Sequence, residues 1–128
     1  MNTTWHHNWW ADNVRERQPR VRFGQNHIFN NLYTSNSTNY CVRAGIEANL
    51  LIEANYFDGV SDPHEFGDVE VGTITARGNE YVNTTGAQDT GDYPGGSGAG
   101  TPFVPTYSYT ADPASAIPEL VQRCSGPQ

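Results

Sequence analysis

Four of the seven basic residues in this chain fall within ten positions, in the stretch RERQPRVRFG: Arg15, Arg17, Arg20 and Arg22. The chain as a whole has fourteen acidic residues and a net charge of −7, so a local cluster of positive charge is unusual in it. A guanidinium group presents a rigid fork of donors that suits a carboxylate. The cluster therefore indicates a site for a carboxylate-bearing ligand, or else a solvated set of arginines paired with Glu16 and other acidic neighbours.

The composition limits the classes of function that the chain can serve. With 128 residues, of which 36% are hydrophobic and 12% aromatic, it has the size of one domain and can form a core. Its acidity argues against general nucleic-acid binding, and no apolar run is long enough to span a membrane. Asn, Thr, Gly, Tyr and Trp are abundant and Lys is absent, which is typical of secreted β-rich proteins. We expect a monomer without nucleic-acid or membrane partners.

Asparagine recurs at a nearly constant interval, at Asn8, Asn31, Asn55 and Asn79, which are 23, 24 and 24 residues apart. Two residues after each asparagine comes an aromatic ring, in the set Trp10, Tyr33, Phe57 and Tyr81. Three residues before each comes an apolar side chain, in the set Trp5, Ile28, Ile52 and Ala76. The position two before is mostly polar, in the set His6, Phe29, Glu53 and Arg77. Such a period indicates one supersecondary unit per repeat, stacked on its neighbours.

The segments between the asparagines, such as NHIFN, NLLIEA and VGTITA, are short and rich in β-branched residues, and no amphipathic helix fits among them. We therefore predict an all-β fold, a right-handed parallel β-helix with roughly 20 to 25 residues per turn. An antiparallel sandwich is the alternative. Each asparagine is expected at a bend, in the left-handed backbone conformation, with its amide bonded to the next in a ladder. The aromatic rings are expected to stack in the same way inside the solenoid.

The repeat fades in the last third of the chain. We expect residues 1–83 to form coils of the β-helix, and residues 84–128, rich in Gly and Pro, to form an irregular segment of the same domain. Four residues with helical spacing predict a short helix that caps or covers the coils: Ile117, Leu120, Val121 and Cys124. A full-strength repeat begins close to Met1, where a solenoid needs a protected first coil. We therefore expect the chain to be the C-terminal portion of a longer protein.

The sequence does not decide whether the two cysteines form a disulfide. Cys41 and Cys124 allow one disulfide, which is plausible in an exported protein if the tail folds back on the coil that contains Cys41. The alternative is a buried thiol at Cys124, on the apolar face of the terminal helix.

The backbone around the arginines predicts how their side chains are grouped. Side chains two positions apart share a face of an extended strand, so we expect Arg15 with Arg17, and Arg20 with Arg22, to project together. Because guanidinium groups are not buried unpaired, this segment is expected to face outward. Pro19 cannot donate a ladder hydrogen bond and predicts a bulge or a departure from the strand.

Several motifs occur together in a fixed order: TTWHHNWW, then R-x-P-x-x-R at Arg17, Pro19 and Arg22, then FGQNHIFNNLYTS and EANYF. Together they resemble the C-terminal half of the family 1 polysaccharide lyases, the pectate lyases. The resemblance runs from about Thr3 to Asn83 and more loosely through the tail. It implies a parallel β-helix and a secreted enzyme that performs calcium-dependent β-elimination on α-1,4-linked polygalacturonate.

The resemblance also implies roles for single residues. Arg17 falls where the family places the base that removes the C5 proton of galacturonate. Arg22 falls where the family places an arginine that binds the substrate carboxylate, and Pro19 shapes the turn between the two. Arg15 and Arg20 lie outside the motif. A base role for Arg17 requires neighbouring cations, such as calcium or the adjacent arginines, because a guanidinium group holds its proton tightly.

Other matched residues are expected to be structural. His6, His7 and Asn8 match a family motif in the interior of the fold, and the remaining ladder residues are Asn31, Asn55 and Asn79. In the family the calcium-binding carboxylates and a substrate-binding lysine lie upstream of this region, so we expect calcium in the complete enzyme and no ligand for it in this chain. The acidic residues after the third repeat are expected to be a solvated loop: Asp58, Asp62, Glu65, Asp68 and Glu70. The isolated chain is expected to be inactive and poorly soluble.

Two other functions fit the same fold. A pectin lyase acts on methyl-esterified substrate without calcium, but a neutral ester would not call for so many arginines. A non-catalytic β-solenoid could bind plant polysaccharide or serve as an adhesin. Replacement of Arg17 in the complete protein separates an enzyme from a binding module.

Overall fold

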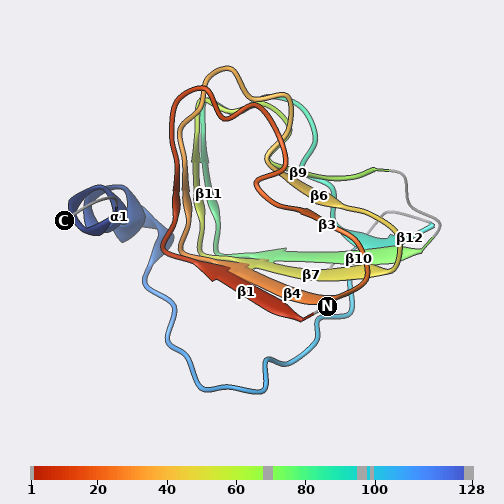
Figure 1. Cartoon of the computed structure of the whole chain (residues 1–128). Helices are drawn as coiled ribbons and strands as arrows, with labels where there is room; N and C mark the ends of the chain where they lie inside the picture. The colour runs from red at the N-terminus through yellow and green to blue at the C-terminus, as the bar shows by residue number, and fades with distance from the viewer. Residues whose placement is uncertain (1, 68–70, 95–97, 99, 126–128) are drawn as a thin grey trace.

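Three β-sheets wind around one core in the computed structural model, which describes residues 2–67, 71–94, 98 and 100–125 (Figure 1). Sheet A contains β1 (Thr3–His6), β4 (Gly24–Phe29), β7 (Ala48–Glu53) and β10 (Gly72–Arg77). Sheet B contains β2 (Trp9–Trp10), β5 (Leu32–Tyr33), β8 (Tyr56–Asp58) and β11 (Glu80–Val82). Sheet C contains β3 (Arg20–Val21), β6 (Val42–Ala44) and β9 (His64–Phe66). Equivalent strands of successive coils pair in parallel, so the predicted parallel β-helix is confirmed.

The sequence repeat sets the register of sheet A. The apolar set three residues before the asparagines forms one column that faces the core: Trp5, Ile28, Ile52 and Ala76. The mostly polar set forms the adjacent column on the outer face: His6, Phe29, Glu53 and Arg77. Successive residues of a strand point to opposite faces, so the two columns separate the core from the outer surface.

The repeat asparagines form the ladder that their spacing predicts. The side-chain nitrogen of Asn8 donates to Oδ1 of Asn31 at 3.0 Å. Asn31 donates in the same way to Asn55 at 3.1 Å, and Asn55 donates to Asn79 at 3.0 Å. The backbone N–H groups of the first three donate to the same oxygens. These amides therefore tie each coil to the next at the corner between sheets A and B.

The aromatic rings two residues after the asparagines stack along the inside of sheet B. Adjacent rings are nearly parallel, with centroids 6.2 Å apart for Trp10 and Tyr33, 4.6 Å for Tyr33 and Phe57, and 5.3 Å for Phe57 and Tyr81. The predicted ring stack is present, and it fills the core beside the aliphatic column of sheet A.

The bend between sheets A and B is made one residue earlier than predicted. The residues directly before the ladder asparagines have positive φ, with values of 54°, 53°, 52° and 64°: His7, Asn30, Ala54 and Gly78. The prediction that the ladder asparagines themselves adopt the left-handed conformation is therefore wrong. The residue before each asparagine turns the chain, which leaves the asparagine backbone free to donate to the next coil.

The coils extend further than the repeat in the sequence. Isolated parallel bridges join Ser61 to Thr85 and His64 to Gln88, so the chain still follows the coil path beyond residue 83. The next strand, β12 (Gly91–Tyr93), returns antiparallel to β10 and covers the edge of sheet A. This part of the segment 84–128 is therefore more regular than predicted.

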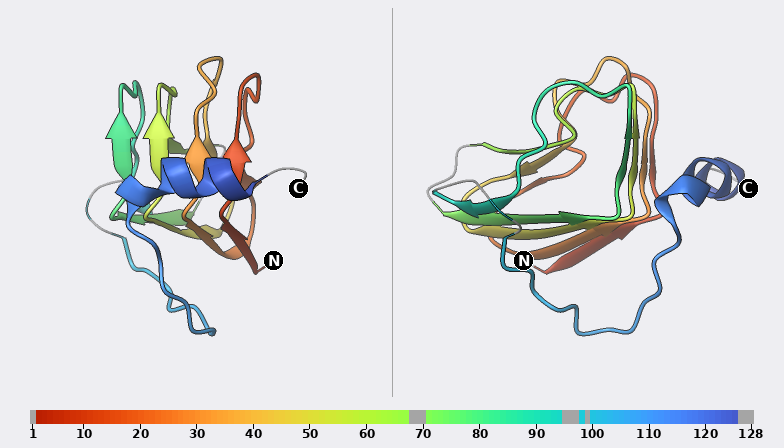
Figure 2. Two further views of the ribbon diagram at one scale, coloured as in Figure 1. Left: turned by 90° about the vertical axis from the view of Figure 1, so that its left-hand side faces the viewer. Right: turned by 180° about the vertical axis from the view of Figure 1, so that it is seen from behind.

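A short helix follows, as predicted, after one turn of 3₁₀-helix at Ala114–Ala116. The helix α1 (Ile117–Cys124) buries Ile117 and Val121 against Leu32 and Tyr56 of sheet B. It lies outside the coils, along the corner between sheets A and B, and covers their flank (Figure 2). In the described part of the chain, no helix is both long enough and apolar enough to cross a membrane.

Candidate functional site

The arginine-rich stretch connects sheet B to sheet C in the first coil, and it is not one extended strand. Arg17 has a φ of 62°, and Pro19 lies in the turn directly before β3. The prediction that Arg15 and Arg17 project together is wrong, because it requires an extended backbone. The turn is held from beneath, since Gln18 and Pro19 are buried and both bond to the next coil. The Gln18 N–H donates to the Cys41 carbonyl at 2.8 Å, and the Pro19 carbonyl accepts from the Arg43 N–H at 3.0 Å.

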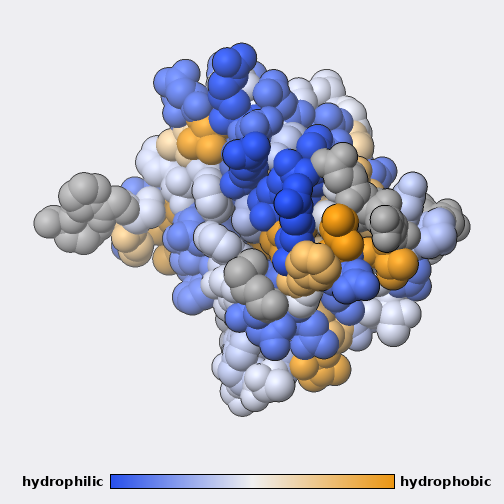
Figure 3. Space-filling view, turned by 45° about the vertical axis from the view of Figure 1, so that its right-hand side comes forward, coloured by the Kyte–Doolittle hydropathy of each residue, from blue (hydrophilic) through white to orange (hydrophobic). Residues whose placement is uncertain are grey.

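Three arginines line one open hollow beside this turn, which we call the arginine hollow. Arg17, Arg20 and Arg22 lie there with Trp5 and Pro19, around a volume of about 540 Å³. No Asp or Glu is among the lining residues that the structure describes, so the hollow is cationic. The face of the molecule that Figure 3 shows is hydrophilic over much of its centre, with several hydrophobic groups beside it. A carboxylate in this hollow would meet charge-assisted donors from more than one side chain.

The three arginines are held differently. Arg20 and Arg22 flank the buried Val21 and therefore project outward together, as predicted. The Arg17 side chain is 65% exposed, and its Nε lies 3.8 Å from Oε1 of Glu16, which is itself 42% exposed. Exposed pairs at such a distance contribute little, so Glu16 competes weakly with a carboxylate ligand for Arg17.

The next coil carries an arginine that the sequence did not single out. Arg43 of β6 is in register with Arg20, forms an ion pair with Glu65 of β9, and lies 3.7 Å from the ring centroid of Tyr40. Unlike Arg17, it therefore has an acidic partner on its own sheet. The 23-residue repeat, applied to Arg20, would have identified this position.

Two glycines make room for the long arginine side chains on sheet C. A Cβ atom at Gly45 would lie 2.9 Å from Cγ of Arg22, and one at Gly67 would lie 2.5 Å from Cδ of Arg43. Each arginine stem therefore crosses the following coil at a place where that coil has no side chain. The guanidinium groups reach outward over the sheet surface as a result.

The two histidines of the HHN motif lie on the outside of the coils, so the prediction of an interior position is wrong for them, whereas Asn8 joins the ladder. Because Trp5 faces the core, His6 faces outward, where its ring stacks on that of Phe29 with centroids 5.1 Å apart. His7 makes the left-handed bend, and its Nε2 lies 3.0 Å from Oδ2 of Asp112. Both imidazoles face the C-terminal segment rather than the core.

A second polar cluster lies on the outer face of sheet A, beneath residues 102–113, which we call the strap (Figures 1 and 2). Glu53 is at its centre. Its carboxylate accepts from Tyr109 OH at 2.6 Å and from Arg77 Nε at 2.5 Å, and it lies 3.1 Å from His27 Nε2. The sequence placed Glu53 and Arg77 in the mostly polar column, but it did not show that His27 and Tyr109 would join them under the strap.

Burial governs the ionisation of this cluster. It lowers the pKa of His27 and outweighs the opposing effect of Glu53. Burial alone would raise the pKa of Glu53, but hydrogen bonds from Tyr109, Arg77 and His27 outweigh it and lower that pKa. The centre of the cluster is therefore an uncharged imidazole beside an ionised carboxylate that Arg77 neutralises.

The acidic residues after the third repeat have structural contacts where they are described. Oδ1 of Asp62 accepts a backbone N–H at 2.6 Å, Glu65 forms the ion pair noted above, and Asp58 is exposed at the end of β8. Asp68 and Glu70 lie outside the described residues. Within the described ranges, no group of three or more His, Cys, Asp or Glu side chains could hold a metal ion. The described members of this set, Asp58, Asp62 and Glu65, do not form a calcium site.

The two cysteines lie in different environments. Cys41 is fully buried in the core, and burial raises the pKa of its thiol far above the usual range. Cys124 is exposed at the end of α1, so the two are not joined in a disulfide. The alternative prediction of a buried thiol at Cys124 is also wrong, because the buried face of α1 consists of Ile117 and Val121.

Comparisons with known proteins agree on one family. A family model described as pectate lyase matches residues 1–125. The pectate trisaccharide-lyase of Bacillus licheniformis is 30% identical over 124 residues, which covers 96% of this chain and 34% of that protein. Pectate lyase B of Dickeya chrysanthemi is 34% identical over 127 residues, which covers 90% of this chain and 33% of that protein. The chain thus spans about a third of the length of these curated relatives.

Solved structures give the same result. Pectate lyase II from Xanthomonas campestris superposes with a TM-score of 0.74 at 25% identity, covering 98% of this chain and 40% of that one. A pectate lyase from a Bacillus species, solved in complex with trigalacturonate, superposes with a TM-score of 0.73 at 29% identity, covering 96% and 39%.

Proposed function

The chain belongs to the pectate lyase family, and we propose that it is part of a secreted lyase that cleaves polygalacturonate by β-elimination. The arginine hollow is the observation that carries this proposal. It brings Arg17, Arg20 and Arg22 together without an acidic residue in its described lining. One solved relative is in complex with trigalacturonate, whose sugars each carry a carboxylate.

The reaction explains why such a hollow is useful. β-Elimination removes the proton at C5 of a galacturonate, breaks the bond between C4 and the glycosidic oxygen, and leaves a double bond between C4 and C5. The departing oxygen is protonated. The C5 proton lies next to a carboxylate and is weakly acidic, because its removal adds negative charge to an anionic group. Cations around that carboxylate stabilise the transition state.

Each arginine then has a task. Arg22 binds the carboxylate of the reacting sugar with its fork of donors. Arg17 is the base that accepts the C5 proton. A guanidinium group acts as a base only where nearby cations favour its neutral form, and Arg20 and Arg22 are the cations that share its hollow.

The complete enzyme is expected to use calcium, held by residues outside this chain. When bound, calcium would add positive charge beside the substrate carboxylate. The described residues supply no ligand set for it. We therefore assign this chain the arginine side of the active site, and to the rest of the protein the metal side.

The test uses the complete protein, with polygalacturonate as substrate and the ultraviolet absorbance of the unsaturated product as the measurement. Arg17→Ala is expected to lower kcat by roughly 10²- to 10⁴-fold, the usual range for loss of a general base. Arg15→Ala is the matched control, since Arg15 is exposed nearby but does not line the hollow. It should leave kcat unchanged.

Three results would contradict the proposal. Turnover of methyl-esterified pectin without calcium, in preference to polygalacturonate, would indicate a pectin lyase. Binding of polysaccharide without any turnover by the wild type would indicate a binding module. Equal losses in Arg17→Ala and Arg15→Ala would remove Arg17 from the mechanism.

A further inference from the structure

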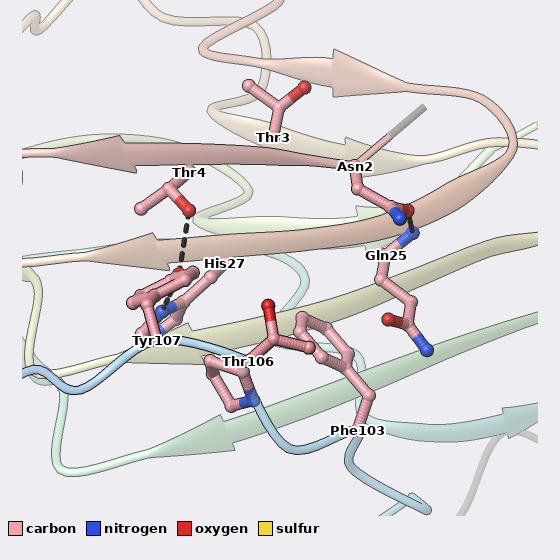
Figure 4. Close-up of a pocket in the computed structure, with 9 residues that line it drawn as sticks. Asn2, Thr3, Thr4, Gln25, His27, Phe103, Thr106 and Tyr107 are labelled. Atoms are coloured by element: carbon pink, nitrogen blue, oxygen red, sulfur yellow. Dashed lines mark hydrogen bonds between the residues drawn. The ribbon is translucent and has the colours of Figure 1, made fainter.

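We propose that a second hollow, under the strap on the outer face of sheet A, binds an uncharged sugar ring. This strap hollow has a volume of about 240 Å³ and shares no described residue with the arginine hollow. Figure 4 shows Asn2 and Gln25 on one side of it, Thr106 and the ring of Phe103 on the strap, and the ring of Tyr107 at the other end.

The strap hollow is uncharged. None of the described residues that line it is Asp, Glu, Lys or Arg. His27 is its titratable imidazole, and burial lowers the pKa of His27, so the ring is neutral at neutral pH. A carboxylate that entered would lose its hydration without gaining a charged partner. The hollow therefore disfavours the ionised galacturonate that suits the arginine hollow.

The remaining groups match a pyranose. Phe103 and Tyr107 present aromatic rings, and a sugar ring has a C–H face that packs on such surfaces. The amides of Asn2 and Gln25 and the hydroxyl of Thr106 supply donors and acceptors for sugar hydroxyls. An apolar wall with a few convergent polar groups is the usual composition of a small-molecule site.

The wall formed by Tyr107 is fixed before any ligand arrives. Its hydroxyl lies 2.6 Å from Thr4 Oγ1 and 2.8 Å from His27 Nδ1, and Nε2 of His27 lies 3.1 Å from Oε1 of Glu53. This chain of contacts ties the strap to three successive strands of sheet A. A ligand would therefore not have to order the Tyr107 ring, which lowers the cost of binding.

Pectin offers two sources of an uncharged ring, methyl-esterified galacturonate and neutral sugars. The inference rests on the proposed function for this choice of probes alone. Binding is followed by ¹H–¹⁵N NMR titration of the complete protein carrying Arg17→Ala, so that no probe is cleaved. The probes are fully methyl-esterified trigalacturonate, unesterified trigalacturonate and a neutral galactose trisaccharide.

Saturable shifts are expected at the Gln25 side-chain amide and the Thr106 backbone with an uncharged probe. Binding of the esterified trimer alone would identify esterified pectin as the ligand, and binding of the galactose trimer alone would identify a neutral sugar. Binding of both would show that the shared ring is recognised. If neither uncharged probe shifts these residues, the inference is overturned. Shifts with the unesterified trimer alone would also overturn it.

A pair of variants locates the binding. Phe103→Ala, which removes one aromatic wall, is expected to weaken the affinity for the uncharged probe about tenfold. Phe23→Ala is the matched control, because Phe23 is an aromatic residue 50% exposed and outside both hollows. Equal effects of the two would overturn the inference. Turnover of polygalacturonate by the wild type, measured in parallel, tests the proposed function separately.

Discussion

Sheets A and C of the same coils both carry arginine on their outer faces, yet the two faces treat it differently. Under the strap, Arg77 donates to Glu53, a carboxylate that is 12% exposed and also accepts from Tyr109. In the arginine hollow, Arg17 is 65% exposed and has Glu16 at 3.8 Å. The strap cluster thus pairs the half-exposed Arg77 with a nearly buried carboxylate at short distance, whereas Arg17 in the arginine hollow is exposed and only distantly paired with Glu16.

The difference separates charge used for folding from charge kept for a ligand. A charge that is desolvated must find its partner within the protein, and the strap brings Tyr109 to Glu53 for this purpose. A charge that must bind an external carboxylate has to remain accessible and without a strong internal competitor. The two sites should therefore respond differently to mutation, with a loss of stability at the strap cluster and a loss of catalysis at the arginine hollow.

The largest effect on this comparison is expected from Glu53→Ala. It leaves the buried His27 and the Tyr109 hydroxyl without their acceptor and the half-exposed Arg77 without its partner, and loss of hydrogen bonds to a charged group costs about 1.5 to 3 kcal/mol of unfolding free energy. Denaturant unfolding of the complete protein measures it. Glu119→Ala is the control, since this carboxylate is 81% exposed in a pair within α1 and should cost no more than about 0.5 kcal/mol. Similar losses from the two variants would show that the strap cluster does not stabilise the fold.

A smaller effect of a different kind is expected from Arg22→Ala. Arg22 is exposed, so its loss should leave the denaturation midpoint unchanged while KM for polygalacturonate rises about tenfold, the value of one charge-assisted contact. Steady-state kinetics and thermal unfolding of the same preparation measure both. A lowered midpoint with an unchanged KM would reverse the assignment of the two faces.

The fold was predictable from the sequence because it depends on repetition. The interval between Asn8, Asn31, Asn55 and Asn79 fixes the coil length, and the rings and aliphatic residues at constant offsets fix which side faces the core. The same residue types recur at the same offsets in each coil, so a local sequence pattern determines how the coils stack. The exact residue that bends the chain was not predictable in this way, because His7, Asn30, Ala54 and Gly78 share no chemical type.

The candidate site was predictable in part, for the same reason. The arginines are contiguous, so the sequence indicates their cluster, and alternation about Val21 groups Arg20 with Arg22. The position of the Arg17 side chain depends on its left-handed backbone conformation, which no sequence pattern predicts. The strap cluster joins residues 27, 53, 77 and 109, and the last of these lies beyond the repeat. Only the return of the strap over sheet A brings them together.

The smallest effect concerns pH and tests whether the strap cluster is uncharged at His27. Its pKa in the folded state is lowered from 6.5 by burial, so the unfolded or released state binds a proton first as the pH falls. Strap docking should therefore be fully stable above pH 6.5 and weaken as the pH falls below that value, with Glu53 adding a further loss below 4.5. Among the described residues, the charged and titratable groups that face His27 are Glu53, Arg77, His6, Tyr107 and Tyr109.

Hydrogen exchange of the Asp112 amide, which donates to Oδ1 of Asn30 at the end of the strap, reports this loosening locally. From about pH 8 to about pH 5, after correction for intrinsic exchange, protection should decline in the wild type. His27→Gln cannot take up a proton in this range and should show a flatter profile. His7 also contacts Asp112, so His7→Gln is the control, and it should keep the wild-type slope if His27 is the responsible group. A slope that persists in His27→Gln and disappears in His7→Gln would move the pH dependence from the buried cluster to the exposed corner.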